Sequence, residues 1–357
     1  MSNKILFIIN NLGYGGAETV FVNDANALHK LGYDVCFAIL YGDKSKSPLL
    51  SSLRIESNKI FFLESKSIYD INSLLKFRNL LKSLGRVSVY STLNDAIFFS
   101  RFAVLFFKDI SLFIREANVA YPKPKIFKIF DILMNFLVKN IIVVSKEVGV
   151  SLESYLPFYK GKIAILYNGV NIPESSHIDD GRTILANGSL TPKKDQKTLI
   201  LAFLEVLRSY PEASLRIIGD GVMRLELESF IQDIGVVEKV KFLGNLERQS
   251  VDKEYMKASV FVLSSTREGC PNVLLEAMSF GIPSIATNVG AVTEIINDGQ
   301  SGYVVPVKDV VKITQKIIEL MNDSALRKKI GDLGRQRIIE NFSMSKHIDR
   351  LISIIFV

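Results

Sequence analysis

The chain has 357 residues, of which 48% are hydrophobic and 23% charged, and its formal net charge is +7. This length and composition favour a globular α/β protein with two domains of ordinary size. They argue against a transmembrane helix, because no uninterrupted run of about 18 apolar residues occurs. Cys36 and Cys270 lie far apart without metal-type spacing, which is typical of a protein of the reducing cytoplasm.

Strand-like apolar runs alternate with helical patterns through the first half of the chain. The expected strands are residues 5–9, 35–40, 59–63, 87–90, 111–114, 141–144 and 163–166, and helical patterns at 18–30 and 71–84 fall between them. This alternation is typical of an open parallel sheet covered by helices on both faces. The first run lacks a small-residue cleavage site, so we expect a strand there and not a signal peptide.

The second half repeats this rhythm with strands expected at residues 183–186, 215–218, 240–242, 260–263, 284–286 and 303–305. Turn-forming and polar residues at 168–182 indicate a hinge between the halves. We therefore expect one Rossmann-like lobe over residues 1–172, a second over 173–342, and a final helix over 343–357. Open α/β sheets bind ligands at the carboxyl ends of their strands, so a cleft between the lobes is the expected site.

Two carboxylates, Glu268 and Glu276, lie eight positions apart around a Gly/Pro turn. Pro271 suits the first turn of a helix, and apolar residues after it predict a buried face. The backbone N–H groups of Asn272 and Val273 would then point outward at the helix N-terminus, where the dipole favours an anion. A phosphate cradle flanked by two carboxylates fits a nucleotide-sugar, although two solvated glutamates at a helix start are the simpler alternative.

Glycines also follow the first strand of each half. Gly15 and Gly16 would let the backbone approach a phosphate closely, but Glu18 replaces the third glycine of a G-x-G-x-x-G motif, which argues against a dinucleotide site. In the second half, Gly188 is followed by two adjacent lysines, Lys193 and Lys194. These lysines are candidates for a phosphate contact, and a solvated basic turn is the alternative.

These segments resemble the retaining nucleotide-sugar glycosyltransferases with the two-lobed GT-B fold, the large group 1 or family 4 type, whose signature is Glu-x7-Glu. Gly188, Leu190 and Lys194 fall on the family's next motif, and Gly-Gly-Ala-Glu at residues 15–18 matches its first loop. The resemblance covers nearly the whole chain, strongly over residues 186–306 and loosely between 43 and 140. It implies that the final helix crosses back to the first lobe.

The resemblance also implies roles for the site residues. Glu276 would accept hydrogen bonds from ribose hydroxyls, Glu268 would face the donor sugar, and Lys194 would neutralise the diphosphate as the sugar–phosphate bond breaks. Lys194 and Glu268 are therefore the predicted catalytic residues. The predicted donor-binding residues are Gly15, Gly16, Gly188, Ser189, Lys194, Asn272, Val273 and Glu276.

Two positions depart from the family pattern. Ser189 stands where many relatives have an arginine, so a bidentate phosphate contact is lost, and Arg115, Lys193 or Arg267 are candidates to replace it. Arg115 ends a strand where several relatives place a histidine, so we predict an acceptor-side or diphosphate role for it, with a surface arginine as the alternative. His29, His177 and His347 are assigned no catalytic role.

Metal ligands with a recognisable spacing are missing from the sequence, which contains no Asp-x-Asp motif and no His/Cys/Asp cluster. We therefore expect metal-independent transfer with no cofactor, in which Lys194 and helix N-termini meet the diphosphate charge. The family retains the anomeric configuration. Since no covalent nucleophile stands out, we expect front-face attack, with the leaving phosphate helping to take the acceptor's proton.

Residues 96–108 and 123–136 combine phenylalanines with basic residues, as helices in a bilayer interface do. The alternative is that both segments simply cover the first sheet. Residues 1–175 hold 21 Lys and Arg against 14 Asp and Glu, whereas residues 176–357 hold 23 of each. This basic half favours an anionic membrane, at about 1 kcal/mol per basic residue near the surface.

We therefore expect a cytoplasmic glycosyltransferase that is peripheral on the inner face of the cell membrane. It would move a hexose or N-acetylhexosamine from a UDP-sugar, with a GDP-sugar as the alternative, to a polyisoprenyl-diphosphate-linked or other glycan in O-antigen, capsule or similar polysaccharide assembly. The alternatives are a non-catalytic GT-B scaffold or sugar-binding protein and a nucleotide-sugar epimerase. A pI near 9.1 suggests nucleic-acid binding, but the sequence lacks the interleaved aromatic and basic strand positions that such binding would need.

Overall fold

The computed structural model describes residues 3–13, 15–118, 125–174 and 177–356, without the side chains of residues 46 and 125–127. The chain divides into two compact units. Unit 1 consists of Met1–Asn168 and His347–Val357, and unit 2 consists of Gly169–Lys346. The boundary between the units therefore falls after residue 168, where the sequence analysis places it after residue 172, and unit 1 is built from two separate stretches of chain.

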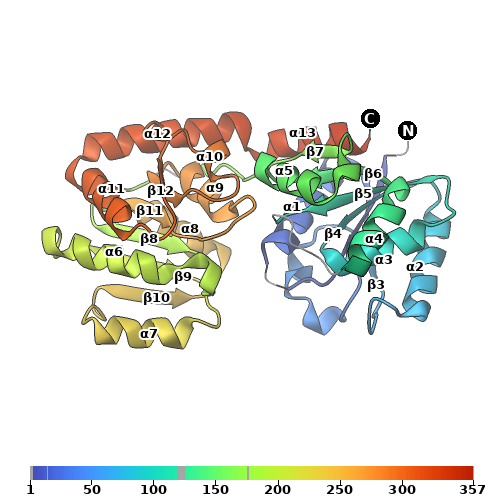
Figure 1. Cartoon of the computed structure of the whole chain (residues 1–357), viewed down its shortest axis with the longest axis horizontal. Coiled ribbons are helices and arrows are strands. Elements are labelled where there is room, and N and C mark those ends of the chain that lie inside the picture. The colour runs from blue at the N-terminus through green and yellow to red at the C-terminus, as the bar shows by residue number, and fades with distance from the viewer. Residues whose placement is uncertain (1–2, 14, 119–124, 175–176, 357) are drawn as a thin grey trace. The chain divides into compact units, whose positions relative to one another are not determined.

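The described part of unit 1 contains a seven-stranded parallel sheet with the order β3-β2-β1-β4-β5-β6-β7 (Figure 1). Its strands are β1 (Lys4–Ile9), β2 (Asp34–Ile39), β3 (Ile60–Phe62), β4 (Val87–Thr92), β5 (Ile110–Glu116), β6 (Val138–Val143) and β7 (Ile163–Ile165). Residues 5–9 of β1 are completely buried, as expected for a central strand covered on both faces.

The helices of unit 1 follow the strands in a βαβ order. They are α1 (Gly16–Lys30), α2 (Ile71–Leu84), α3 (Asn94–Val104), α4 (Lys125–Leu133) and α5 (Lys146–Tyr155), with 3-10 turns at η1 (Lys44–Lys46), η2 (Pro48–Ser52), η3 (Ser57–Lys59), η4 (Asn135–Leu137) and η5 (Pro157–Tyr159). Asp70 caps α2 through the N–H groups of Asn72 and Ser73, which explains why that helix begins where it does.

The described part of unit 2 contains a six-stranded parallel sheet with the order β10-β9-β8-β11-β12-β13. Its strands are β8 (Thr183–Asn187), β9 (Ser214–Ile218), β10 (Val240–Gly244), β11 (Val260–Leu263), β12 (Ser284–Thr287) and β13 (Tyr303–Val305). The helical segments are η6 (Pro192–Lys194), α6 (Gln196–Ser209), α7 (Arg224–Asp233), α8 (Arg248–Lys257), α9 (Asn272–Ser279), α10 (Val292–Ile295), α11 (Val310–Asn322) and α12 (Ser324–Asn341).

The last helix, α13 (Met344–Ile355), belongs to unit 1 from His347 onward, as expected for a helix that returns to the first lobe. The two chain crossings lie side by side. On the unit 2 side, the Val170 N–H donates to Phe342 O at 2.9 Å. On the unit 1 side, His347 Nδ1 lies 2.6 Å from Tyr167 O. The segment around residues 167–170 and the segment around residues 342–347, where the chain passes between the units, are therefore joined by a backbone hydrogen bond and by a buried histidine.

The predicted fold class, two parallel α/β sheets, is confirmed by this topology. The sequence left open whether residues 96–108 face a bilayer or cover the first sheet. Helix α3 packs on the sheet, because Ala96, Ile97, Phe99 and Val104 are buried, whereas Phe106 after the helix is 87% exposed. Within the described residues, no helix has the length and apolar content needed to span a bilayer.

Candidate functional site

The predicted catalytic residues of unit 2 meet beyond the carboxyl edge of its sheet. Lys194 lies in the turn that follows β8, and Glu268 lies in the loop that follows β11. Because β8 and β11 are parallel neighbours, these two loops emerge at the same edge. They are joined by hydrogen bonds from the Thr266 N–H to Lys193 O at 2.7 Å and from Ser264 Oγ to Lys194 O at 3.0 Å.

Lys194 and Glu268 form a largely buried ion pair. Lys194 Nζ lies 2.6 Å from Glu268 Oε1, and the Ser265 hydroxyl donates to the same oxygen at 2.6 Å. Both of these contacts are made by Oε1, and Lys194 carries two further N–H donors. A carboxylate and an ammonium are thus held next to each other.

The structure distinguishes the two adjacent lysines. Lys194 contacts Glu268, whereas Lys193 is exposed and contributes only its carbonyl oxygen to the loop contact. Gly188 makes room for Lys194, because a Cβ atom at that position would lie 3.2 Å from Lys194 Cε. Ser189 is exposed, and its backbone oxygen accepts a hydrogen bond from the Gln196 side chain at 3.1 Å. A phosphate contact of Lys193 in place of the missing arginine stays a prediction.

Helix α9 begins at Asn272, with Pro271 as the residue before its first turn. Its own hydrogen bonds start with the N–H groups of Leu274 and Leu275, which donate to Pro271 O at 3.1 and 3.3 Å. The N–H groups of Asn272 and Val273 thus lie outside the ladder of the helix, at its positive end. The start of the helix agrees with the sequence to within one residue, and phosphate binding there stays a prediction.

Glu276 is held by two residues that the sequence reasoning missed. Arg248 Nη1, from the start of α8, lies 2.8 Å from Glu276 Oε1, and the Tyr255 hydroxyl lies 3.1 Å from Oε2. Tyr255 is completely buried and also accepts a hydrogen bond from Asn187 Nδ2 at 2.9 Å. Burial, and next the Glu276 carboxylate, raises the pKa of Tyr255 well above its usual range, so its hydroxyl remains a neutral donor.

Gly290 is another residue that the motif analysis missed. A Cβ atom at Gly290 would lie 2.5 Å from Glu268 O and 2.6 Å from Gly269 O, and its φ of +54° is in the left-handed region. Only glycine therefore lets the loop after β12 close against the Glu268 loop. The neighbouring Ala291 N–H donates to Gly269 O at 2.8 Å. Such a close backbone approach becomes visible only when the two loops are placed in space.

The glycine loop of unit 1 lies at the start of α1. Gly15 is the residue before the helix, and its oxygen accepts hydrogen bonds from both the N–H and the hydroxyl of Thr19. A Cβ atom at Gly15 would collide with the Glu18 carboxylate, at 2.2 Å from Oε2. Burial raises the pKa of Glu18. Gly15 thus leaves space for the Glu18 carboxylate, which folds back over the loop.

Arg115 is buried, so the alternative of a surface arginine is wrong. Only 2% of it is exposed, because its side chain lies inside unit 1, where Nη2 donates to Asn168 Oδ1 at 2.6 Å. Its Nε and Nη1 atoms have no hydrogen-bond partner among the described residues. The predicted role of Arg115 at the acceptor stays a prediction, and any ligand would have to reach a buried guanidinium.

Arg115 shares the interior of unit 1 with a buried ion pair. His347 Nε2 lies 2.8 Å from Asp24 Oδ1, and both side chains are almost completely buried. Burial alone would lower the pKa of His347, but the Asp24 carboxylate and the hydrogen bonds of the ring outweigh it, so that pKa is raised. Since His347 also contacts Tyr167 O, we assign this cluster to holding the chain crossings together.

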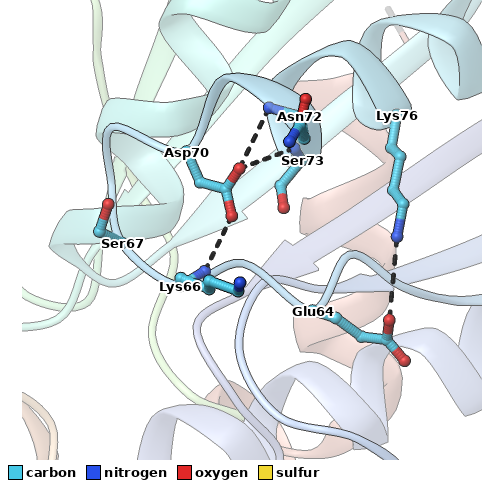
Figure 2. A pocket seen from close by; sticks show the side chains of 7 residues that line it. All are labelled: Glu64, Lys66, Ser67, Asp70, Asn72, Ser73 and Lys76. Carbon is cyan, nitrogen blue, oxygen red and sulfur yellow. Dashed lines mark hydrogen bonds and ion pairs between the residues drawn. The ribbon is translucent and has the colours of Figure 1, made fainter.

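A polar pocket in unit 1 contains none of the predicted site residues (Figure 2). It is lined by Glu64, Lys66, Ser67, Asp70, Asn72, Ser73 and Lys76. The Asp70 carboxylate accepts the N–H groups of Lys66, Asn72 and Ser73, and Lys76 lies 3.8 Å from Glu64. These groups serve to begin α2, so the pocket gives no sign of chemistry.

No group of three His, Cys, Asp or Glu side chains suited to a metal ion occurs in the described residues.

Comparison with known proteins places this site in context. Residues 170–337, nearly all of unit 2, match the family model of glycosyl transferases group 1. An uncharacterized glycosyltransferase of Haemophilus influenzae is 25% identical over 350 residues, which cover 97% of this chain and 98% of that protein. A Campylobacter jejuni protein is 27% identical over 342 residues, 94% of this chain and 93% of its own.

The Campylobacter jejuni protein is named GalNAc-alpha-(1->4)-GalNAc-alpha-(1->3)-diNAcBac-PP-undecaprenol alpha-1,4-N-acetyl-D-galactosaminyltransferase. Among solved structures, Anabaena HepE in complex with UDP matches with a TM-score of 0.81 and 18% identity over 98% of both chains. The chain thus has the GT-B fold, and the match of its second unit to the group 1 glycosyltransferases supports glycosyltransferase activity for this protein.

Proposed function

We propose that this protein is a retaining glycosyltransferase that transfers a hexose or N-acetylhexosamine from a nucleotide-diphosphate sugar, with UDP as the favoured nucleotide. The observation that carries the proposal is the contact between Lys194 and Glu268, beside the N-terminus of α9. A nucleotide-sugar presents a diphosphate and sugar hydroxyls close together, and this pair offers a cation and a carboxylate side by side.

In the proposed reaction, the donor diphosphate binds Lys194 Nζ and the N–H groups of Asn272 and Val273, with Lys193 in reach of the same charge. The bond between the anomeric carbon and the phosphate oxygen breaks, and its electron pair stays on the phosphate. Lys194 stabilises this developing charge. The acceptor hydroxyl attacks from the face that the phosphate leaves, and its proton passes to the leaving phosphate oxygen.

The two glutamates serve different parts of the donor in this proposal. Glu268 accepts hydrogen bonds from the sugar through its open Oε2 atom, while Lys194 and Ser265 keep Oε1 in place. Glu276 accepts hydrogen bonds from the ribose hydroxyls. The ribose would either displace the half-exposed Arg248 from this carboxylate or share the carboxylate with it. Tyr255 keeps the carboxylate oriented from the buried side. We propose that the transfer needs no metal ion, because Lys194 and the helix terminus supply the counter-charge.

The acceptor is proposed to be a glycan carried on a polyisoprenyl diphosphate or a related glycan of surface-polysaccharide assembly. The name of the Campylobacter jejuni relative, which acts on an undecaprenol-linked glycan, supports this class of acceptor. The UDP bound to Anabaena HepE supports the choice of base. Such a lipid-linked acceptor would be met at the inner face of the cell membrane, where we propose that the protein works as a peripheral enzyme.

Binding of UDP, GDP, ADP and NAD, measured by calorimetry in the presence and absence of EDTA, tests this proposal. We expect one nucleoside diphosphate, UDP, to bind with the same affinity with and without EDTA. The Glu276→Ala variant should lose that binding, whereas Glu226→Ala, a change of an exposed glutamate on α7, should keep it. No binding of any nucleotide by the wild-type protein would overturn the enzyme proposal and favour a non-catalytic scaffold.

A further inference from the structure

Helix α4 of unit 1 buries an acidic residue and exposes two of its apolar residues. Asp131 is only 4% exposed, whereas Leu133 is 67% exposed and Ile129 is also exposed. Phe136, in the following turn η4, is 70% exposed. Ile129, Leu133 and Phe136 follow the i, i+4, i+7 spacing of one helix face. A surface helix normally buries that stripe, so the outward face of α4 is not adapted to water.

Phe158 extends this apolar face from a different part of the chain. It lies in η5 and is exposed, and its backbone oxygen accepts a hydrogen bond from Asn135 Nδ2 at 3.0 Å. Asn135 directly precedes Phe136, so the two phenylalanines come from neighbouring turns. We call the set Ile129, Leu133, Phe136 and Phe158 the apolar ridge. Its members come from segments about 30 residues apart, which shows that the fold gathers them.

The ridge rests on a buried polar anchor. Arg101, on α3, forms an ion pair with Asp131 and donates a hydrogen bond to the Tyr159 hydroxyl at 2.8 Å. All three side chains are almost fully buried. The anchor joins α3, α4 and η5, and Phe130 adds ring contacts to Phe98 and Phe102 at 4.5 and 4.9 Å. Because α4 is fixed by its polar side, its apolar side is presented outward in a defined position.

Lysines lie close to the ridge residues in the sequence. Lys139 and Lys160 are exposed beside η4 and η5, and Lys128 on α4 lies over the Tyr155 ring at 4.7 Å. Residues 125–162 contain six lysines against three acidic residues, of which Asp131 is buried. Unit 1 as a whole holds 22 Lys and Arg against 14 Asp and Glu, whereas unit 2 holds 22 against 23. A partner of the ridge must therefore be apolar inside and negatively charged at its surface.

We propose that unit 1 docks on an anionic lipid bilayer through the apolar ridge, with Ile129, Leu133, Phe136 and Phe158 at the level of the acyl chains and the neighbouring lysines among the headgroups. Aliphatic and aromatic side chains flanked by lysines match this boundary in both polarity and charge. The inference adds a specific surface to the peripheral location included in the proposed function, and it stands on contacts independent of the donor site.

Flotation of the full-length protein with vesicles tests the proposal. The wild-type protein should float with vesicles of phosphatidylglycerol and phosphatidylcholine, bind pure phosphatidylcholine weakly, and dissociate as the salt concentration rises. Leu133→Asp should weaken binding to the anionic vesicles by about tenfold or more, because it removes apolar area and adds a negative charge. Leu225→Asp, at an exposed leucine of α7 in unit 2, is the matched control and should float like the wild type.

Three outcomes would overturn the inference: no flotation of the wild type, equal flotation of Leu133→Asp and the wild type, or an equal loss in both variants. A concentration-dependent dimer that Leu133→Asp abolishes, without lipid binding, would instead assign the ridge to a second copy of the chain. Circular dichroism and UDP calorimetry of each variant show that it is folded. A protein that floats through the ridge but binds no nucleotide would contradict the proposed function alone.

Discussion

Units 1 and 2 share a parallel α/β architecture but use their charged residues in opposite ways. In unit 2, Lys194, Glu268 and Glu276 are paired at the edge of the sheet, within reach of solvent. In unit 1, Asp24, Arg115 and His347 are buried, and apolar side chains lie outside on α4. Charges at an accessible edge can exchange partners with a substrate, whereas charges sealed in the interior fix the chain in place.

The buried pair of unit 1 should give the largest effect on stability. His347→Ala leaves Asp24 as an unpaired charge in the interior, so we expect the free energy of unfolding to fall by about 3–5 kcal/mol. Urea denaturation followed by circular dichroism measures this loss. His29→Ala, at a partly exposed histidine of α1, is the control and should change stability by about 0.5 kcal/mol or less. A loss as small as the control's would show that the pair does not hold unit 1 together.

The ion pair of unit 2 should matter above all for catalysis, and removing Lys194 should also cost some stability because Glu268 is largely buried. We expect Lys194→Ala to lower kcat by about 100- to 1,000-fold, because the leaving diphosphate loses its cation. Lys193→Ala, one residue away and exposed, should reduce the rate far less. Steady-state transfer assays with matched thermal melts compare the two variants. If Lys193→Ala proved the more damaging change, the assignment of Lys194 to the diphosphate would be wrong.

Glu276 offers a more moderate test of the same site. Glu276→Gln keeps the shape but removes the charge that Arg248 and the ribose would share. We expect UDP affinity to fall by about 10- to 100-fold, since hydrogen bonds to a charged group are worth about 1.5–3 kcal/mol. Tyr255→Phe should show a smaller loss, because it removes one supporting contact. Calorimetry with UDP gives both values, and unchanged affinity in Glu276→Gln would exclude the ribose role.

The smallest expected effect is the pH dependence of unit 1 stability. The pKa of His347 is higher in the folded protein than its ordinary value of about 6.5, so the folded state binds the proton more tightly. This contribution is complete below about pH 6.5 and is lost as the pH rises through the raised pKa, with a slope of at most about 1.4 kcal/mol per pH unit. Denaturation curves at several pH values measure it, and His347→Gln should flatten that region. If the free energy of unfolding of the wild type rose with pH in this range, while that of His347→Gln did not, the predicted direction would be wrong.

The sequence predicted the architecture of both units well, because strands such as β1 and β8 are short apolar runs bounded by turn residues. It also placed Glu268 and Glu276 on a loop and a helix, since the Pro271 signal is local. It missed Arg248, Tyr255 and Gly290, whose contacts with the site loops join residues up to 28 positions apart and leave no local pattern. The sequence could not show that Arg115 is buried, because residues on the two faces of a strand cannot be told apart when the elements packed against each face are unknown.

The divided construction of unit 1 has a consequence for how the protein is made. Residues 347–357 belong to unit 1, yet they leave the ribosome only after all of unit 2 has been synthesised. Until then, Asp24 lacks His347, and the surface that receives α13 stays uncovered. Domains usually fold in the order of their synthesis. Here the unit that begins first is completed last, so unit 2 can reach its native state while unit 1 still waits for its final helix.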